Sequence, residues 1–251
     1  MSREAHATLT RRDDEQAAER EQRAAVGPAR VADLGCGPGN STALLCARWP
    51  AAEVLGVDNS AEMLERARAS GLPARWLEAD LAGWAPAVPY DLLYSNAALQ
   101  WLPDHSTLLP RLLGALRAGG VLAVQVPRNF DAPSHVLLRA VAEEGPWAPH
   151  LAARLLRAPV AEPAWYYDLL APLAAALDIW ESDYLHVLDG DDPVLSWTRA
   201  TALRPVIAAL GRDEQASFEA EYAKRLQAAY PRRPDGRTLF PFRRLFIVAA
   251  R

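Results

Sequence analysis

The chain has 251 residues, and its hydrophobic content of 51% suffices for a sizeable core, so we expect one large domain or one domain with a cap. Its net charge is −4, its isoelectric point is near 5.8, and no dense basic stretch occurs, which argues against a nucleic-acid partner. Two cysteines, Cys36 and Cys46, are too few for a disulfide framework or a metal cluster, so we expect two small buried thiols and no metal.

The first 29 residues contain almost no large apolar side chain, so we expect a polar arm, either a solvated helix or a disordered segment, that ends at Gly27-Pro28. No apolar run reaches the roughly 18 residues of a membrane span. The charged start also lacks the apolar centre of a signal peptide. We therefore expect a cytoplasmic protein without a membrane partner. No heptad or strand-edge pattern points to self-association, so a monomer is expected.

Beyond the arm, short apolar runs alternate with helical patterns. Ser60 is expected to cap the second helix, and His105 is expected in an exposed turn. The predicted strands are 30–35, 53–58, 75–80, 90–96 and 121–126, the predicted helices are 41–49, 61–69 and 108–116, and 117–120 is predicted to be a turn. Apolar strands joined by helices indicate an α/β fold with a parallel sheet that is covered on both faces.

The remainder of the chain is mostly helical. The predicted helices are 134–144, 164–176, 193–210 and 214–230, and the predicted strands are 177–188 and 244–250. Two strands separated by about fifty helical residues suggest a cap inserted before the last strand. The expected organisation is a polar arm at 1–29 and one domain at 30–251, with a helical cap at about 146–176 and 189–240. The sheet then has seven strands in a Rossmann-like arrangement.

The stretch VADLGCGPGN, from Val31 to Asn40, has the pattern of a strand, a tight glycine turn and a helix. Its spacing is D-x-G-x-G-x-G, which differs from the G-x-G-x-x-G of dinucleotide-binding loops. A carboxylate at the mouth of such a loop would repel a phosphate but would suit an ammonium or a sulfonium. Loops of this kind in methyltransferases bind S-adenosylmethionine (SAM). An ordinary strand-to-helix turn is the alternative interpretation.

Polar residues follow the carboxyl ends of the predicted strands, where ligands bind in sheets of this kind. Asp58 can accept both ribose hydroxyls of an adenosine, because a carboxylate offers two oxygens to two donors. Asp80 can accept from the adenine amine while Leu81 packs on the ring. Helix N-caps are the alternative roles for Asp58 and Asp80. The candidate cofactor-binding residues are Asp33, Gly35, Gly37, Gly39, Asn40, Asp58, Asp80, Leu81 and Asn96.

Five segments together resemble the trans-aconitate 2-methyltransferase family: VADLGCGPGNSTALL, SNAALQWLPD, VLAVQVPRN, WTRATALRP and FPFRRLFIVA. The resemblance runs from about Val31 to Arg251 and implies a class I methyltransferase fold, SAM as cofactor and a small tricarboxylate as substrate. Two features depart from the family. Residues 1–29 hold no Trp, Tyr or Phe, whereas members begin with an aromatic segment that closes over the cofactor, and Arg128 replaces an acidic or neutral residue.

The resemblance implies methyl transfer to a carboxylate, which is already ionised at neutral pH because its pKa is roughly 4. No general base is then needed, and catalysis is expected to rest on positioning and on the removal of water. Gln100 and Trp101 follow the fourth strand, near the expected point of transfer, although Trp101 could instead pack in the core. Arginine grips a carboxylate with two parallel hydrogen bonds. The candidate substrate-binding residues are Arg128, Asn129, Tyr166, Tyr167, Arg204 and Arg243.

Neighbouring residues on a strand point to opposite faces, so either Arg243 or Arg244 faces the site, and Arg243 is the named candidate. Three alternatives for the function remain at this stage. The chain could methylate another small acid or a malonyl thioester on a carrier protein, although the absence of a basic docking face counts against an acidic carrier. It could bind SAM without catalysis. A NAD-dependent dehydrogenase is a weaker alternative, because the glycine spacing differs.

Overall fold

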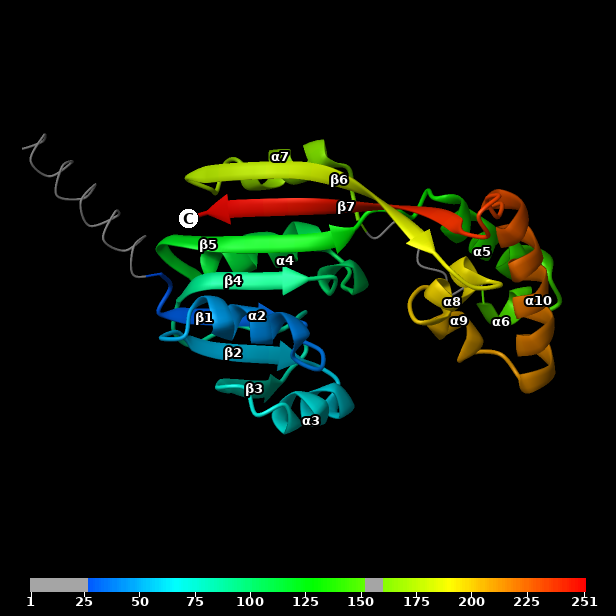
Figure 1. The fold of residues 1–251 in the computed structure, drawn as a ribbon. Helices are drawn as coiled ribbons and strands as arrows, with labels where there is room; N and C mark the ends of the chain where they lie inside the picture. Colours follow the sequence, from blue (N-terminus) through cyan, green and yellow to red (C-terminus); the bar gives the residue numbers. More distant parts are fainter. Residues whose placement is uncertain (1–26, 152–159) are drawn as a thin grey trace, which may run out of the picture. The chain divides into compact units, whose positions relative to one another are not determined.

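A single seven-stranded sheet organises the protein. The computed structural model describes residues 27–151 and 160–251, so the expected arm lies almost entirely outside the described residues. The strands are β1 (Arg30–Leu34), β2 (Glu53–Asp58), β3 (Ala74–Glu78), β4 (Tyr90–Asn96), β5 (Leu116–Pro127), β6 (Ala176–Leu188) and β7 (Thr238–Ala250). Their order in the sheet is β3-β2-β1-β4-β5-β7-β6 (Figure 1).

The sheet is mostly parallel, as predicted. β1 pairs in parallel with β2 and with β4, and β2 pairs in parallel with β3. β7 runs against β5, because the Gly119 N–H donates to the Arg251 carbonyl at one end and the Arg128 N–H donates to the Arg243 carbonyl at the other. Figure 1 shows the reversed arrow of β7. The predicted α/β fold with a seven-stranded, mostly parallel sheet is confirmed.

The chain divides into two compact units, which are described in turn. Unit 1 comprises 27–124, 167–178 and 247–251, and unit 2 comprises 125–166 and 179–246. In unit 1, α2 (Asn40–Arg48) packs on β1 and β2, and α3 (Ala61–Ala69) packs on β2 and β3 (Figure 1). The Ser60 hydroxyl accepts the Met63 N–H at 3.3 Å, so the predicted cap is confirmed.

A short 3₁₀ helix η1 (Leu99–Trp101) and α4 (His105–Gly114) follow β4 in unit 1. His105 is buried at the start of α4, and its ring Nε2 lies 2.8 Å from the Leu99 carbonyl oxygen. The expectation of an exposed turn there is therefore wrong, because the ring has a backbone partner six residues earlier. Both cysteines are buried, as expected, and burial raises the pKa of the Cys36 thiol to about 12.

Unit 2 is mainly helical. Its helices are α5 (Pro133–Glu144), α6 (Ala148–Leu151), α8 (Pro193–Arg199), α9 (Arg204–Ile207) and α10 (Arg212–Ala229), and α7 (Pro163–Leu170) begins in it. α10 packs along α5 (Figure 1). Buried tyrosines join them: the Tyr222 hydroxyl donates to the Ser134 carbonyl at 2.9 Å, and the Tyr230 hydroxyl accepts the Ser134 N–H at 3.0 Å. Unit 2 thus has a core of its own around α5 and α10.

Several boundaries differ from the sequence-based predictions, and at two places the element itself differs. The predicted turn at 117–120 is part of β5, because the C-terminal residue Arg251 supplies backbone partners for Gly119 and Gly120. The predicted helix at 193–210 is instead the two short helices α8 and α9. Pro205 lies in the first turn of α9, where its missing N–H is tolerated, and a continuous helix would need that donor.

Within the described ranges, no helix combines the length and apolarity needed to cross a membrane. The organisation predicted from the sequence, an arm followed by one domain with a helical cap, stays a prediction. The division into units does not follow the expected cap, because 125–145 and 179–188 also belong to unit 2.

His135 on α5 should make the stability of the protein fall on acidification. Burial, assisted by the charge of Arg139, lowers its pKa from the ordinary 6.5 to about 4. The folded state therefore disfavours the protonated ring, so stability is full above about pH 6.5 and falls as the pH drops toward 4. Since the ring is only partly buried, we expect a loss of about 1–2 kcal/mol over this range.

Urea unfolding at pH 7 and pH 4.5 measures this loss directly. The His135→Phe variant, which keeps a ring next to Phe130, should lose that share of the pH dependence. An unchanged pH profile in this variant would show that other groups are responsible.

Candidate functional site

The glycine loop between β1 and α2 lies at the carboxyl end of β1. Gly35 has a φ of +75°, and a Cβ atom at this position would lie 2.1 Å from the Cβ atom of Ala98. Only glycine therefore lets the loop pass the segment that follows β4. Gly37 has a φ of +53°, and a Cβ atom there would meet nothing within 4 Å. The backbone at Gly37 is bare on this side, as a ligand-binding loop requires.

Asp33 lies beneath the loop and is fully buried rather than open at its mouth. Its Oδ2 accepts hydrogen bonds from Ser41 Oγ at 2.7 Å and from Thr42 Oγ1 at 2.6 Å, and its Oδ1 has no partner. Burial raises the pKa of this carboxyl, and the two hydroxyl groups act in the opposite direction. The carboxylate fixes the start of α2 against the loop and keeps one acceptor unused.

Ser41 and Thr42 are residues that the sequence-based reasoning did not single out. The sequence does contain a pattern that points to them, because two hydroxyl side chains stand at the start of a predicted helix, shortly after an acidic residue near the end of a strand. The hydroxyl groups satisfy half of a buried carboxylate, which would otherwise be very costly to bury.

Asp58 at the end of β2 holds the loop from the other side. Its Oδ2 accepts the Gly37 N–H at 2.8 Å, and its Oδ1 accepts the Ser60 N–H at 2.9 Å. A carboxylate has about four lone-pair sites, so each oxygen can accept one more hydrogen bond. The side chain is only partly buried. Asp58 thus ties the loop to β2 and still has capacity for two ligand hydroxyl groups.

The other predicted cofactor-binding residues of unit 1 lie after β3 and β4 or at the start of α2. Asp80 is exposed, and its Oδ1 accepts the Ala82 N–H at 2.8 Å, while Leu81 beside it is buried. Asn96 is the last residue of β4 and is exposed, and Asn40 is the exposed first residue of α2. Neither Asp58 nor Asp80 is a helix N-cap, since Ser60 caps α3 and no described helix begins directly after Asp80.

Gln100 and Trp101 lie in η1, after β4. The Gln100 Nε2 donates to the Ala97 carbonyl at 2.7 Å, and its buried Oε1 has no partner. Trp101 is 48% exposed, so it does not pack in the core. The alternative interpretation of Trp101 as a core residue is therefore wrong. An unused buried acceptor and an exposed aromatic ring follow the strand at which methyl transfer was expected.

The candidate substrate-binding residues of unit 2 are placed in different ways. Arg128 forms ion pairs with Glu162, at 2.7 Å, and with Glu181. Tyr166 is buried, its hydroxyl accepts the Ala161 N–H at 3.3 Å, and burial raises its pKa to about 12. Glu162 and Glu181 thus neutralise Arg128.

Arg243 forms a two-point ion pair with Asp183, with the closer distance, from Nε to Oδ1, at 2.9 Å. Arg204 is exposed at the start of α9. Asn129 is buried, and its Nδ2 has no partner. Tyr167 belongs to unit 1 and is 58% exposed. The structure therefore brings Arg128 and Arg243 together through a backbone hydrogen bond, but it leaves Arg204 outside that contact.

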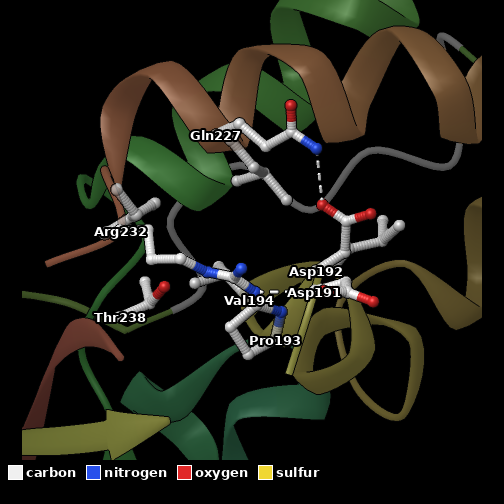
Figure 2. Close-up of a pocket in the computed structure, with 10 residues that line it drawn as sticks. Asp191, Asp192, Pro193, Val194, Gln227, Arg232 and Thr238 are labelled. Atoms are coloured by element: carbon white, nitrogen blue, oxygen red, sulfur yellow. Dashed lines mark hydrogen bonds and ion pairs between the residues drawn. The ribbon is translucent and has the colours of Figure 1, made fainter. Parts of the chain in front are cut away.

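A pocket of about 190 Å³ lies in unit 2 among the start of α8, the end of α10 and the start of β7 (Figure 2). Four of its polar side chains pair with one another. Asp192 accepts from Gln227 at 2.7 Å, and Arg232 pairs with Asp191 at 3.1 Å. None of the residues predicted for the site lines this pocket, so the pocket does not belong to the predicted site.

Comparison with known proteins agrees with this geometry. A family model described as a methyltransferase domain matches residues 31–120, which contain the loop and Asp58. A protein of Azoarcus sp. (strain BH72) named trans-aconitate 2-methyltransferase is 56% identical over 223 residues, which cover 89% of this chain and 87% of that protein. The protein of the same name from Methylobacterium radiotolerans is 51% identical, with 97% of this chain and 96% of that protein covered.

Solved structures show the same fold. The YcgJ protein from Bacillus subtilis superposes with a TM-score of 0.58 at 16% identity, and 89% of this chain and 92% of that chain are covered. A SAM-dependent methyltransferase from Mesorhizobium loti superposes with a TM-score of 0.50 at 24% identity, with 90% and 92% covered. At these identities the likeness concerns the fold alone.

Proposed function

The chain belongs to the trans-aconitate 2-methyltransferase family, and we propose that it transfers the methyl group of SAM to one carboxylate of trans-aconitate, giving a monomethyl ester. The observation that carries this proposal is the identity of 51% to a trans-aconitate 2-methyltransferase over 97% of the chain. Such identity extends through both units and so includes the residues beyond the shared methyltransferase domain. The proposed substrate is therefore specific to the family and not only to the fold.

The loop of unit 1 fits SAM. The bare backbone at Gly37 allows the close approach of a ligand, and Asp33 supports the loop from beneath by holding Ser41 and Thr42 at the start of α2. Asp58 has capacity for the two ribose hydroxyls, and buried Leu81 with exposed Asp80 offers an apolar surface and an acceptor to the adenine. We assign the remaining cofactor contacts to Gly35, Gly39, Asn40 and Asn96.

When bound, SAM supplies an electrophilic methyl carbon, so that a carboxylate oxygen forms the new O–C bond while the C–S bond breaks and its electron pair stays on sulfur. The chain itself needs no general base, because the carboxylate is ionised at neutral pH. Gln100 and Trp101 are the proposed residues beside the reacting atoms, where the Trp101 ring excludes water. The contribution of the chain is therefore alignment and desolvation.

The carboxylates that are not methylated need cationic or amide donors. Asn129 supports this role best among the candidates named from the sequence, because its buried Nδ2 lacks a partner. Arg128 and Arg243 already hold acidic side chains, so substrate binding through either requires exchange of one carboxylate for another. Arg204, Tyr166 and Tyr167 complete the proposed set.

We also propose that the protein acts as a cytoplasmic monomer on its small-molecule substrate, without a nucleic-acid partner. The net charge of −4 supports the last point.

A panel of acids tests the proposed substrate. Purified protein is incubated with SAM and, separately, with trans-aconitate, cis-aconitate, citrate, isocitrate or a malonyl thioester. We expect kcat/KM to be highest for trans-aconitate, by at least tenfold, because the family assignment predicts donors that are matched to its three carboxylates. A reaction without acid gives the background hydrolysis of SAM. A higher kcat/KM for the malonyl thioester would move the function to carrier-protein methylation, and SAM binding without turnover of any acid would leave a non-catalytic SAM-binding protein.

A further inference from the structure

Arg244 on β7 carries a positive charge that no carboxylate neutralises in the described part of the chain. Its guanidinium lies 5.2 Å from the centroid of the Tyr184 ring and 5.3 Å from that of Phe242. Its Nη1 donates to Gln125 Oε1 at 3.2 Å, and its Nε is buried without a partner. The charge is therefore held between aromatic rings, with a neutral amide as its hydrogen-bonding neighbour.

Gln125 on β5 contributes a second buried donor beside Arg244. It is 5% exposed. Because arginine can only donate, the amide oxygen of Gln125 must face Arg244, and the amide nitrogen must be the other end of the group. That nitrogen is buried and has no partner. Two unused N–H donors, from Gln125 and Arg244, thus lie beside a full positive charge, and buried polar groups of this kind nearly always have a partner.

The neighbouring arginines have a different environment. Arg243 points to the opposite face of β7 from Arg244, because side chains alternate along a strand, and it pairs with Asp183. Arg128 pairs with Glu162 and Glu181. On β6, Glu181 and Asp183 alternate with Trp180 and Tyr184, so these two acids lie on the face away from Arg244. The stacking of Trp180 on Phe246, at 4.9 Å between centroids, marks the aromatic face.

We propose that Arg244 and Gln125 form a subsite that binds a carboxylate of the acid substrate other than the one that is methylated. This inference rests on the proposed function. A guanidinium and an amide together offer parallel donors that match the two oxygens of a carboxylate. The Nε of Arg244 and the Nε2 of Gln125 are both buried away from water, which strengthens the attraction. His186, whose Nε2 is buried without a partner, lies 5.9 Å from Phe242 between ring centroids and closes the aromatic wall.

The first test is the kinetics of Arg244→Gln. We expect kcat/KM for trans-aconitate to fall at least 30-fold, mostly through KM, while KM for SAM changes less than threefold. Arg244→Lys should recover part of the loss, because it restores the charge but not the two parallel donors. Arg237→Gln is the matched control, because Arg237 is exposed just before β7 and lies 3.5 Å from its ion-pair partner Asp189. The KM of this variant for trans-aconitate should equal that of the wild type.

Truncated substrates identify the carboxylate. Itaconate, mesaconate and cis-glutaconate each lack one of the three carboxylates of trans-aconitate. One of these acids lacks the carboxylate that Arg244 binds. For this acid, the ratio of kcat/KM for trans-aconitate to kcat/KM for the truncated acid should be at least tenfold smaller in Arg244→Gln than in the wild type, because the variant cannot bind that carboxylate in either substrate. The other preferences should persist. A merely structural role of Arg244 would lower all rates together and leave each ratio unchanged.

Three outcomes would overturn the subsite. They are a KM in Arg244→Gln within threefold of the wild type, a larger effect of Arg243→Gln, and preferences among the acids that do not change. If circular dichroism shows that Arg244→Gln does not fold, the Arg244→Lys variant provides the test. A wild-type KM for trans-aconitate in Arg244→Lys would show that the two parallel donors of arginine are not needed. If the wild type makes no ester, the proposed function fails by itself. The subsite then stands only if calorimetry detects trans-aconitate binding that Arg244→Gln abolishes.

Discussion

Replacing Asp58 by alanine is expected to weaken SAM binding about 100-fold. The carboxylate would lose hydrogen bonds to two ribose hydroxyls, each of which contributes about 1.5–3 kcal/mol when one partner is charged and part of which water can replace. The variant also removes the acceptor of the Gly37 N–H, at 2.8 Å, so the loop loses its tie to β2. Isothermal titration calorimetry with SAM and with S-adenosylhomocysteine measures the effect.

Asp58→Asn should lie between the wild type and the alanine variant. Its amide keeps one oxygen but turns an N–H group toward either Gly37 or Ser60, which are themselves donors. Glu62→Gln is the control, because Glu62 is an exposed acid of α3 that pairs with Arg66. A dissociation constant for Asp58→Ala within threefold of the wild type would contradict the assigned role of Asp58.

Gly35→Ala is expected to destabilise the protein by at least about 3 kcal/mol. The new methyl group would lie 2.1 Å from the methyl of Ala98, and neither group can rotate away, so the backbone must move. The φ of +75° adds about 1 kcal/mol for any residue with a Cβ atom. Chemical unfolding at 25 °C measures the loss, and the double variant with Ala98→Gly should recover the part that is due to the clash.

Gly37→Ala separates stability from binding. Its φ of +53° should cost about 1 kcal/mol, but its methyl group would meet no protein atom within 4 Å. We therefore expect a nearly normal free energy of unfolding together with weaker SAM binding, because the methyl group occupies the side on which the ligand would approach.

Two results would contradict the explanation given for Gly35. They are a Gly35→Ala variant that unfolds at the wild-type denaturant concentration, and a double variant with Ala98→Gly that is no more stable than Gly35→Ala.

Much of unit 1 could be predicted from the sequence, because the relevant signals are local. The strand β2 and the helix α3 begin and end at the predicted residues, and Ser60 caps α3 through its own hydroxyl group. The alternation of apolar runs and helical patterns indicated the α/β character of the sheet. The glycine spacing located the loop, since a backbone with positive φ requires glycine within the same few residues.

The parts that sequence reasoning missed depend on distant partners. Gly119 and Gly120 look like a turn, but Arg251 pairs with their backbone and makes them a strand. His105 looks exposed until the Leu99 carbonyl is found next to its ring. Alternation on β7 showed that only one of Arg243 and Arg244 faces a given side, but it could not say that Asp183 neutralises Arg243. Charge pairing between strands is invisible in a single sequence.

The most direct test of the proposed reaction follows a labelled methyl group. The protein is incubated with trans-aconitate and SAM that carries a ¹³C-methyl group, and the products are analysed by mass spectrometry and NMR. We expect a trans-aconitate monomethyl ester that carries the label in its O-methyl group, formed in a 1:1 ratio with S-adenosylhomocysteine and absent when the acid is left out. SAM that binds but yields no labelled ester would contradict the proposed methyl transfer.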